Sequence, residues 1–166
     1  MGSTLYPLNT LRQKWPSMYA TYAAKYVGRE TLMEQTIPAL SCRWNDVLHF
    51  CPVHPDLIRK GLMAAGYEPK PSQWFVIDPI ALDFNSNNTV IYLYLAKKYR
   101  DFTKRADDFK SFESASLAEF CELPEATVAH YQNSYQTGNI PLLFHRIPHV
   151  LHRGHIPIHK MTVIRS

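Results

Sequence analysis

The spacing of apolar residues predicts helices in the first third of the chain. After Pro16, which suits the first turn of a helix, aromatic and apolar residues recur at intervals of three and four as far as Tyr26, and Gly28 can end the helix. This spacing places a tyrosine-rich stripe on one side, which we expect to pack into the core. A second, short helix is expected over residues 29–35, before Pro38.

From residue 44 onward the pattern predicts short strands alternating with helices and loops. Pro52 ends a first strand, and Pro55 can begin a helix that runs through Leu62. Prolines 141, 148 and 157 indicate that the last segment consists of short strands joined by turns. The other expected elements are strands over 46–50, 74–77, 89–94 and 160–165, a basic helix over 96–104, and a polar helical stretch through 121.

These elements predict an α+β fold in which N-terminal helices precede a region of short strands and helices. With 166 residues, 46% of them hydrophobic, the chain is long enough for one core, and we expect a single domain over 1–166. Residues 1–41 form its helical N-terminal extension and residues 44–165 its α+β core. No apolar run reaches the ~18–20 residues of a bilayer span, so no membrane partner is expected. Three cysteines are too few for a disulfide framework and favour a cytoplasmic location.

The distribution of charge points to an anionic partner. Lysine and arginine balance the acidic residues through residue 125, whereas residues 126–166 contain four basic residues, six of the eight histidines and no acid. Such a segment favours a phosphate, a dinucleotide or a nucleic acid as its ligand.

Three stretches of sequence, taken together, resemble the ADP-ribosyltransferase fold, which includes the RNA 2′-phosphotransferases. The first is a strand with His49, followed by a turn and a helix with Ile58, Gly61 and Leu62, where the family has a helix of the form x-x-I-x-x-x-G-L. The second is the strand over 90–93 with Tyr92, and the third is the segment 149–157, which ends in G-x-I-P. The resemblance covers residues 44–165 and implies an α+β fold in which the N-terminal helices are followed by a split, mostly antiparallel sheet.

The resemblance implies a site that binds NAD and transfers ADP-ribose to a protein or a nucleic acid. By this resemblance, His49 hydrogen-bonds the ribose and Tyr92 stacks on the nicotinamide ring. His149 stands where the family has a catalytic glutamate, so His49, Tyr92 and His149 are the candidate catalytic residues. His49 and Tyr92 would also bind the cofactor, and the phosphates would be held by Arg146, His152 and Arg153.

The histidine in place of the glutamate leaves three forms of this function open. In the first form, the protein is a transferase that works without the glutamate. In the second, it has a basic site that acts on a phosphorylated or nucleic-acid substrate. In the third, it is a domain that binds its ligand without turnover. A rival from another class is a non-catalytic module that binds a nucleic acid or another partner through the basic C-terminal quarter and the basic residues over 97–100.

A metal-dependent hydrolase is a further alternative, because five histidines recur at close spacing. We nevertheless expect no metal ligand, since Pro148, Gly154 and Pro157 disfavour the continuous helix that would align the rings. The series comprises His145, His149, His152, His155 and His159. The sequence leaves the oligomeric state open.

Overall fold

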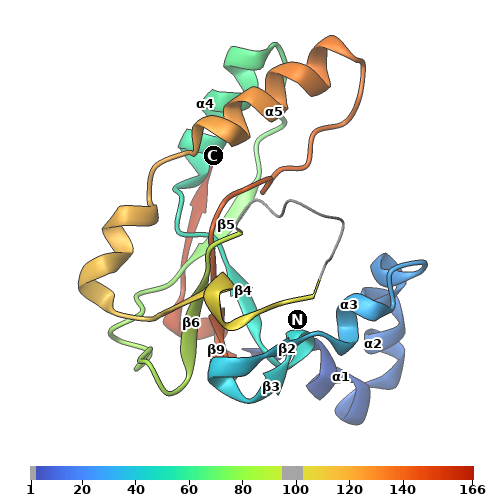
Figure 1. The fold of residues 1–166 in the computed structure, drawn as a ribbon, viewed down its shortest axis with the longest axis vertical. Helices are drawn as coiled ribbons and strands as arrows, with labels where there is room; N and C mark the ends of the chain where they lie inside the picture. Colours follow the sequence, from blue (N-terminus) through green and yellow to red (C-terminus); the bar gives the residue numbers. More distant parts are fainter. Residues whose placement is uncertain (1–2, 95–102) are drawn as a thin grey trace.

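The structure, a computed structural model, describes residues 3–94 and 103–166 and has an α+β fold (Figure 1). Its central sheet is antiparallel, with the strand order β4-β8-β6-β7. These strands are β4 (Leu48–Phe50), β8 (His149–His152), β6 (Thr89–Tyr92) and β7 (Phe109–Ser111). Smaller antiparallel pairs join β1 (Thr4–Leu5) to β9 (Ile156–Pro157), β2 (Thr36–Ile37) to β3 (Cys42–Arg43), and β5 (Gln73–Val76) to β10 (Thr162–Arg165).

The central sheet separates two hydrophobic cores because side chains alternate between its faces. All four residues of β6 are buried, as befits a central strand rich in β-branched and aromatic residues. Val90 and Tyr92 face a core that contains Ile37, Leu40, Val47 and Leu151. Ile91 faces the other core, with Phe84, Phe112, Val150 and Ile156.

Both outer strands of this sheet begin after the same kind of turn. One short 3₁₀ helix, Trp44–Asp46, precedes β4, and another, Ala106–Asp108, precedes β7. The Asp46 carboxylate accepts a hydrogen bond from the Arg43 backbone N–H at 2.7 Å, and Asp108 accepts one from the Arg105 N–H at 2.8 Å. An R-x-x-D sequence therefore caps both turns and sets the start of both strands.

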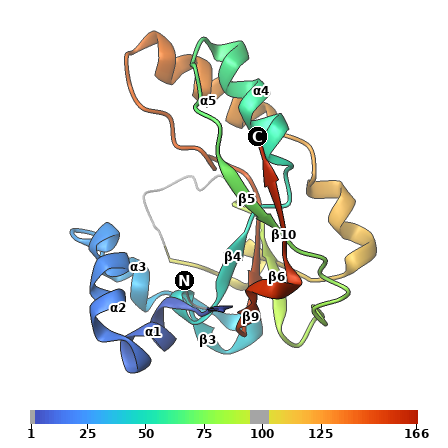
Figure 2. The ribbon, with the colours of Figure 1, turned by 180° about the vertical axis from the view of Figure 1, so that it is seen from behind.

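A third core lies between α4 (Pro55–Ala65) and α5 (Glu125–Gln136), at the opposite end of the molecule from the N-terminal helices (Figure 2). Gly61 allows the close approach of these elements, since a Cβ there would lie 2.6 Å from a methyl group of Leu123. Tyr131 of α5 donates a hydrogen bond to the Leu143 carbonyl, and Thr127 donates one to the His145 carbonyl. These bonds fix the loop that leads into β8.

The N-terminal helices confirm one prediction and correct another. The predicted helix forms as α2 (Pro16–Ala23) with a 3₁₀ turn (Ala24–Tyr26), and α3 (Thr31–Glu34) lies within the second predicted helix; α1 (Leu8–Lys14) was not predicted. The expected core packing of the tyrosine-rich stripe is wrong. No residue of α2, all of which the structure describes, is buried, and Tyr22 is 55% exposed.

The second half of the chain differs from its prediction in two places. Helix α5 forms where strands and turns were expected, because its buried residues are mainly polar or amphipathic (Thr127, Tyr131 and Ser134) and give no apolar periodicity. The stretch before residue 121 is a 3₁₀ helix (Ser114–Phe120). The predicted basic helix over 96–104 falls mostly on residues 95–102, outside the described residues. In the described part of the chain, no helix has the length and apolar character needed to cross a membrane.

Candidate functional site

His49, Tyr92 and His149 lie on the same face of the central sheet. Tyr92 of β6 is directly opposite His149 of β8. His49 of β4 is opposite Leu151, which is two residues beyond His149 and so on the same face. The His49 and His149 rings have centroids 6.4 Å apart in an edge-to-face arrangement. Three strands distant in sequence thus bring the three candidate catalytic residues together.

Each of these two imidazoles is held by a backbone carbonyl. Nε2 of His49 lies 3.1 Å from the Trp44 carbonyl oxygen, and Nδ1 of His149 lies 2.8 Å from that of Ile147. Because a carbonyl oxygen only accepts, the N–H of each neutral ring is assigned to these nitrogens. No hydrogen bond among the described residues engages the second nitrogen of either ring. Nδ1 of His49 and Nε2 of His149 are therefore acceptors.

The pKa values of both imidazoles are lowered, which favours their neutral forms. His49 is exposed, but the protein groups around it partly desolvate the ring and lower its pKa, against the opposing effect of the Trp44 hydrogen bond. Burial also lowers the pKa of His149, and the positive charge of Lys104 adds to this shift.

Two residues that the sequence analysis did not single out complete this face. The Trp44 ring lies edge-on to His49, with centroids 4.9 Å apart, and to Tyr92, with centroids 5.2 Å apart. The Lys104 ammonium donates a hydrogen bond to the Tyr92 hydroxyl at 2.5 Å and lies 5.0 Å from the Trp44 ring centroid. In the sequence, the only indication of a role for Lys104 was composition, since it is one of several basic residues after β6.

Tyr92 is enclosed by protein, in contrast to His49. It is 5% exposed and packs against Trp44, Tyr94 and Phe109. Burial raises the pKa of its hydroxyl to about 12, and the nearby Asp108 carboxylate adds to this shift. Stacking of the Tyr92 ring on a ligand, as predicted, would require this packing to open.

The three residues predicted to hold phosphate do not lie together. His152 is on the opposite face of the sheet, 5% exposed, with its ring stacked on Phe84 at 4.0 Å. Arg146 lies over the Tyr94 ring, 5.7 Å from its centroid. Arg153 donates a hydrogen bond to the Leu40 carbonyl at 3.0 Å. They do not form one phosphate site in this structure.

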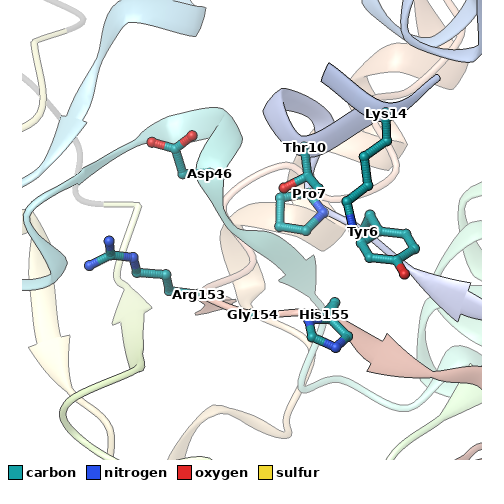
Figure 3. A pocket seen from close by; sticks show the side chains of 8 residues that line it. All are labelled: Tyr6, Pro7, Thr10, Lys14, Asp46, Arg153, Gly154 and His155. Carbon is teal, nitrogen blue, oxygen red and sulfur yellow. The ribbon is translucent and has the colours of Figure 1, made fainter. Parts of the chain in front are cut away.

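A cavity of about 550 Å³ lies beside β1 and the turn after β8 (Figure 3), and neither His49 nor His149 is among its lining residues. In Figure 3, Lys14 reaches toward Tyr6 on one side of it, while the guanidinium of Arg153 points away on the other. The Asp46 carboxylate accepts hydrogen bonds from Asn9 and from the Arg43 backbone, so it has a structural role. The lining residues are Tyr6, Pro7, Thr10, Lys14, Asp46, Arg153, Gly154 and His155.

The five C-terminal histidines are dispersed over the structure. His145 stacks on His130 with centroids 4.1 Å apart, His155 stacks on Tyr6, and His149 and His152 lie on opposite faces of the sheet. Within residues 3–94 and 103–166, no group of three or more histidine, cysteine, aspartate or glutamate residues could hold a metal ion. The spacing that motivated the metal-dependent alternative therefore does not correspond to a cluster among these residues.

Comparisons of the chain with protein-family models, with curated proteins and with solved structures give no match.

Proposed function

We propose that the protein binds NAD or a related nucleotide at the face that carries His49 and His149, and transfers ADP-ribose from it. One observation carries the proposal: two neutral imidazoles from distant parts of the chain each keep one acceptor nitrogen, on one sheet face, beside a lysine and a tryptophan. The resemblance of residues 44–165 to ADP-ribosyltransferases supports NAD as the nucleotide.

The chemistry of this face suits the parts of a nucleotide. Ribose hydroxyls are hydrogen-bond donors, and two acceptor nitrogens at a fixed separation can receive them. Lys104 supplies positive charge for the phosphates, and the half-buried Trp44 offers an aromatic edge to a planar base. Because His49 and His149 are neutral, they add no repulsion toward the positively charged nicotinamide ring.

The proposed reaction breaks the bond between the nicotinamide nitrogen and C1′ of the ribose. Nicotinamide leaves with the bonding electron pair, and an acceptor oxygen or nitrogen forms the new bond to C1′. The proton of that acceptor passes to water, because Nε2 of His149 is engaged by a ribose hydroxyl of the bound nucleotide. A neutral imidazole provides no fixed negative charge for the cationic transition state, so we expect slow turnover.

Calorimetric titration with NAD tests the binding. We expect His49→Ala and His149→Ala each to weaken NAD binding about tenfold, since each removes one hydrogen bond to the ligand. His54→Ala is the matched control, because His54 is an exposed histidine at the start of α4. Wild-type protein that binds no NAD, or equal affinity in all variants, contradicts the proposal.

Release of nicotinamide tests the transfer. A carboxylate at position 149 would stabilise the developing positive charge, so we expect His149→Glu to release nicotinamide faster than the wild type and His149→Ala to release it more slowly. A rate that is the same in all three proteins would remove the transfer step but leave the binding proposal standing.

A further inference from the structure

The N-terminal and C-terminal segments of the chain, both without acidic residues, contact each other in the structure. Residues 1–29 contain four basic residues, five aromatic residues and no acid, and residues 126–166 also contain no acid. Strand β1 pairs with β9, and the Tyr6 ring stacks on His155 with centroids 5.5 Å apart. The positive charge of residues 1–29 is not apparent from the net charge of residues 1–125, because acidic residues after residue 29 bring that net charge to zero.

The helices of this N-terminal segment expose large apolar side chains. Trp15, Met18 and Tyr22 are 42%, 46% and 55% exposed. Met18 and Tyr22, four residues apart, lie on one side of α2, and Trp15 is the residue that immediately precedes this helix. Two accessible aromatic rings, those of Trp15 and Tyr22, therefore lie at the start of α2 and on its outer surface.

Cations lie beside the aromatic rings throughout this N-terminal segment. The Lys14 ammonium is 4.9 Å from the Tyr6 centroid and 5.9 Å from that of Trp15. Arg12 lies 5.8 Å from the Tyr19 centroid, and Lys25 lies 5.1 Å from that of Tyr26. Lys14, the last residue of α1, also lines the 550 Å³ cavity with Thr10 and His155, so α1 connects the cations of this segment to the cavity. The Asp46 carboxylate also lines the cavity, where it accepts hydrogen bonds from Asn9 and from the Arg43 backbone.

We propose that α1, α2 and the adjoining cavity bind single-stranded nucleic acid. The basic side chains of residues 1–29, a segment without acidic residues, would attract its phosphates. Its unpaired bases would stack on the exposed rings of Trp15 and Tyr22. A duplex keeps its base faces covered and so cannot use these rings. This surface shares no residue with the nucleotide site at His49 and His149, so each proposal can fail without the other.

Fluorescence anisotropy of a labelled single-stranded DNA of about 12 nucleotides tests this surface. We expect Trp15→Ala and Tyr22→Ala each to weaken binding about fivefold or more, with an unchanged dependence on salt. Lys14→Gln and Lys25→Gln should each reduce the slope of log K against log salt by about 0.7. Thermal unfolding confirms that each variant is folded.

Matched controls come from the other end of the molecule. Phe75 of β5 is 49% exposed and Lys60 of α4 is also exposed, so Phe75→Ala and Lys60→Gln remove the same kinds of group elsewhere. Both should leave DNA binding unchanged. Equal losses in the controls would overturn the proposal. Tighter binding to duplex DNA or to anionic phospholipid vesicles than to the single strand would also overturn it.

Discussion

The two faces of the central sheet use histidine in opposite ways. His149 and His152 belong to the same strand, β8. Because they are three residues apart and side chains alternate along a strand, they point to opposite faces of the sheet. His149 lies near an exposed imidazole and keeps an acceptor nitrogen, whereas His152 is stacked flat on Phe84 and hydrogen-bonded to Thr89 at 3.0 Å. The comparison teaches that strand position, more than residue type, separates a candidate ligand-binding histidine from a core histidine.

Replacing His152 should have the largest effect on stability. His152→Ala removes the stacking on Phe84, leaves a cavity and removes the donor to the Thr89 hydroxyl, so we expect a loss of about 3 kcal/mol in the free energy of unfolding. His149→Ala should cost less, because His149 is only partly buried. Urea denaturation measures both. Equal losses of stability in the two variants would contradict the distinction between a core histidine on one face of the sheet and a partly buried histidine on the other.

Acid should destabilise the fold through the same core histidine. Burial lowers the pKa of His152 to about 4, with His155 adding to the shift. The unfolded chain, with its ordinary histidine pKa near 6.5, then binds the proton first. The contribution of neutral His152 is therefore complete above pH ~6.5 and is lost as the pH falls toward 4, to a total of about 2–3 kcal/mol.

Unfolding measurements between pH 7 and pH 4 test this dependence. His152→Phe should reduce the acid-induced loss relative to the wild type, since phenylalanine does not titrate and can stack on Phe84. A His152→Phe profile identical to that of the wild type would show that His152 does not cause the loss.

Tyr92 provides a smaller test of the face that carries His49 and His149. Tyr92→Phe keeps the buried ring but removes the hydroxyl that accepts the Lys104 hydrogen bond, so we expect a loss of about 1 kcal/mol in stability. NAD affinity should change less than twofold, because the enclosed ring does not contact the ligand in our proposal. A large loss of NAD binding would instead place the Tyr92 hydroxyl in the site.

The exposed stripe on α2 should give the smallest stability effect. Tyr22→Ala removes a side chain that is more than half exposed, so we expect a change within about 0.5 kcal/mol in urea denaturation. Tyr26→Ala is the comparison, because Tyr26 is partly buried and hydrogen-bonds Asn45 at 3.0 Å, and it should cost more. Equal costs would mean that Tyr22 packs against protein in solution.

Elements with a strong local signal could be predicted from the sequence. Helix α4 begins at Pro55 and runs through Leu62 as expected, and the β-branched run before Tyr92 forms a buried strand. Helix α5 could not be recognised, because Thr127, Tyr131 and Ser134 are buried through loop contacts and tight packing rather than through an apolar stripe. Periodicity also placed the α2 stripe in the core, although no other element covers Met18 or Tyr22 in the described structure.

The candidate site was predictable only in part, for a related reason. The alternation of side chains along β8 already separates His149 from His152. The positions of Trp44 and Lys104 could not be derived, because they depend on how a 3₁₀ turn and the segment after residue 102 fold over β6. Local sequence does not determine such long-range contacts.

The most direct test of the proposed site is nitrogen NMR of the imidazole rings during titration with NAD. We predict that His49 and His149 are neutral at pH 7, protonated at Nε2 and Nδ1 respectively, and that NAD shifts the resonances of Nδ1 of His49 and Nε2 of His149 while those of His152 stay unchanged. Protonated His49 and His149 rings at pH 7, or NAD-induced shifts at neither acceptor nitrogen, would contradict the account.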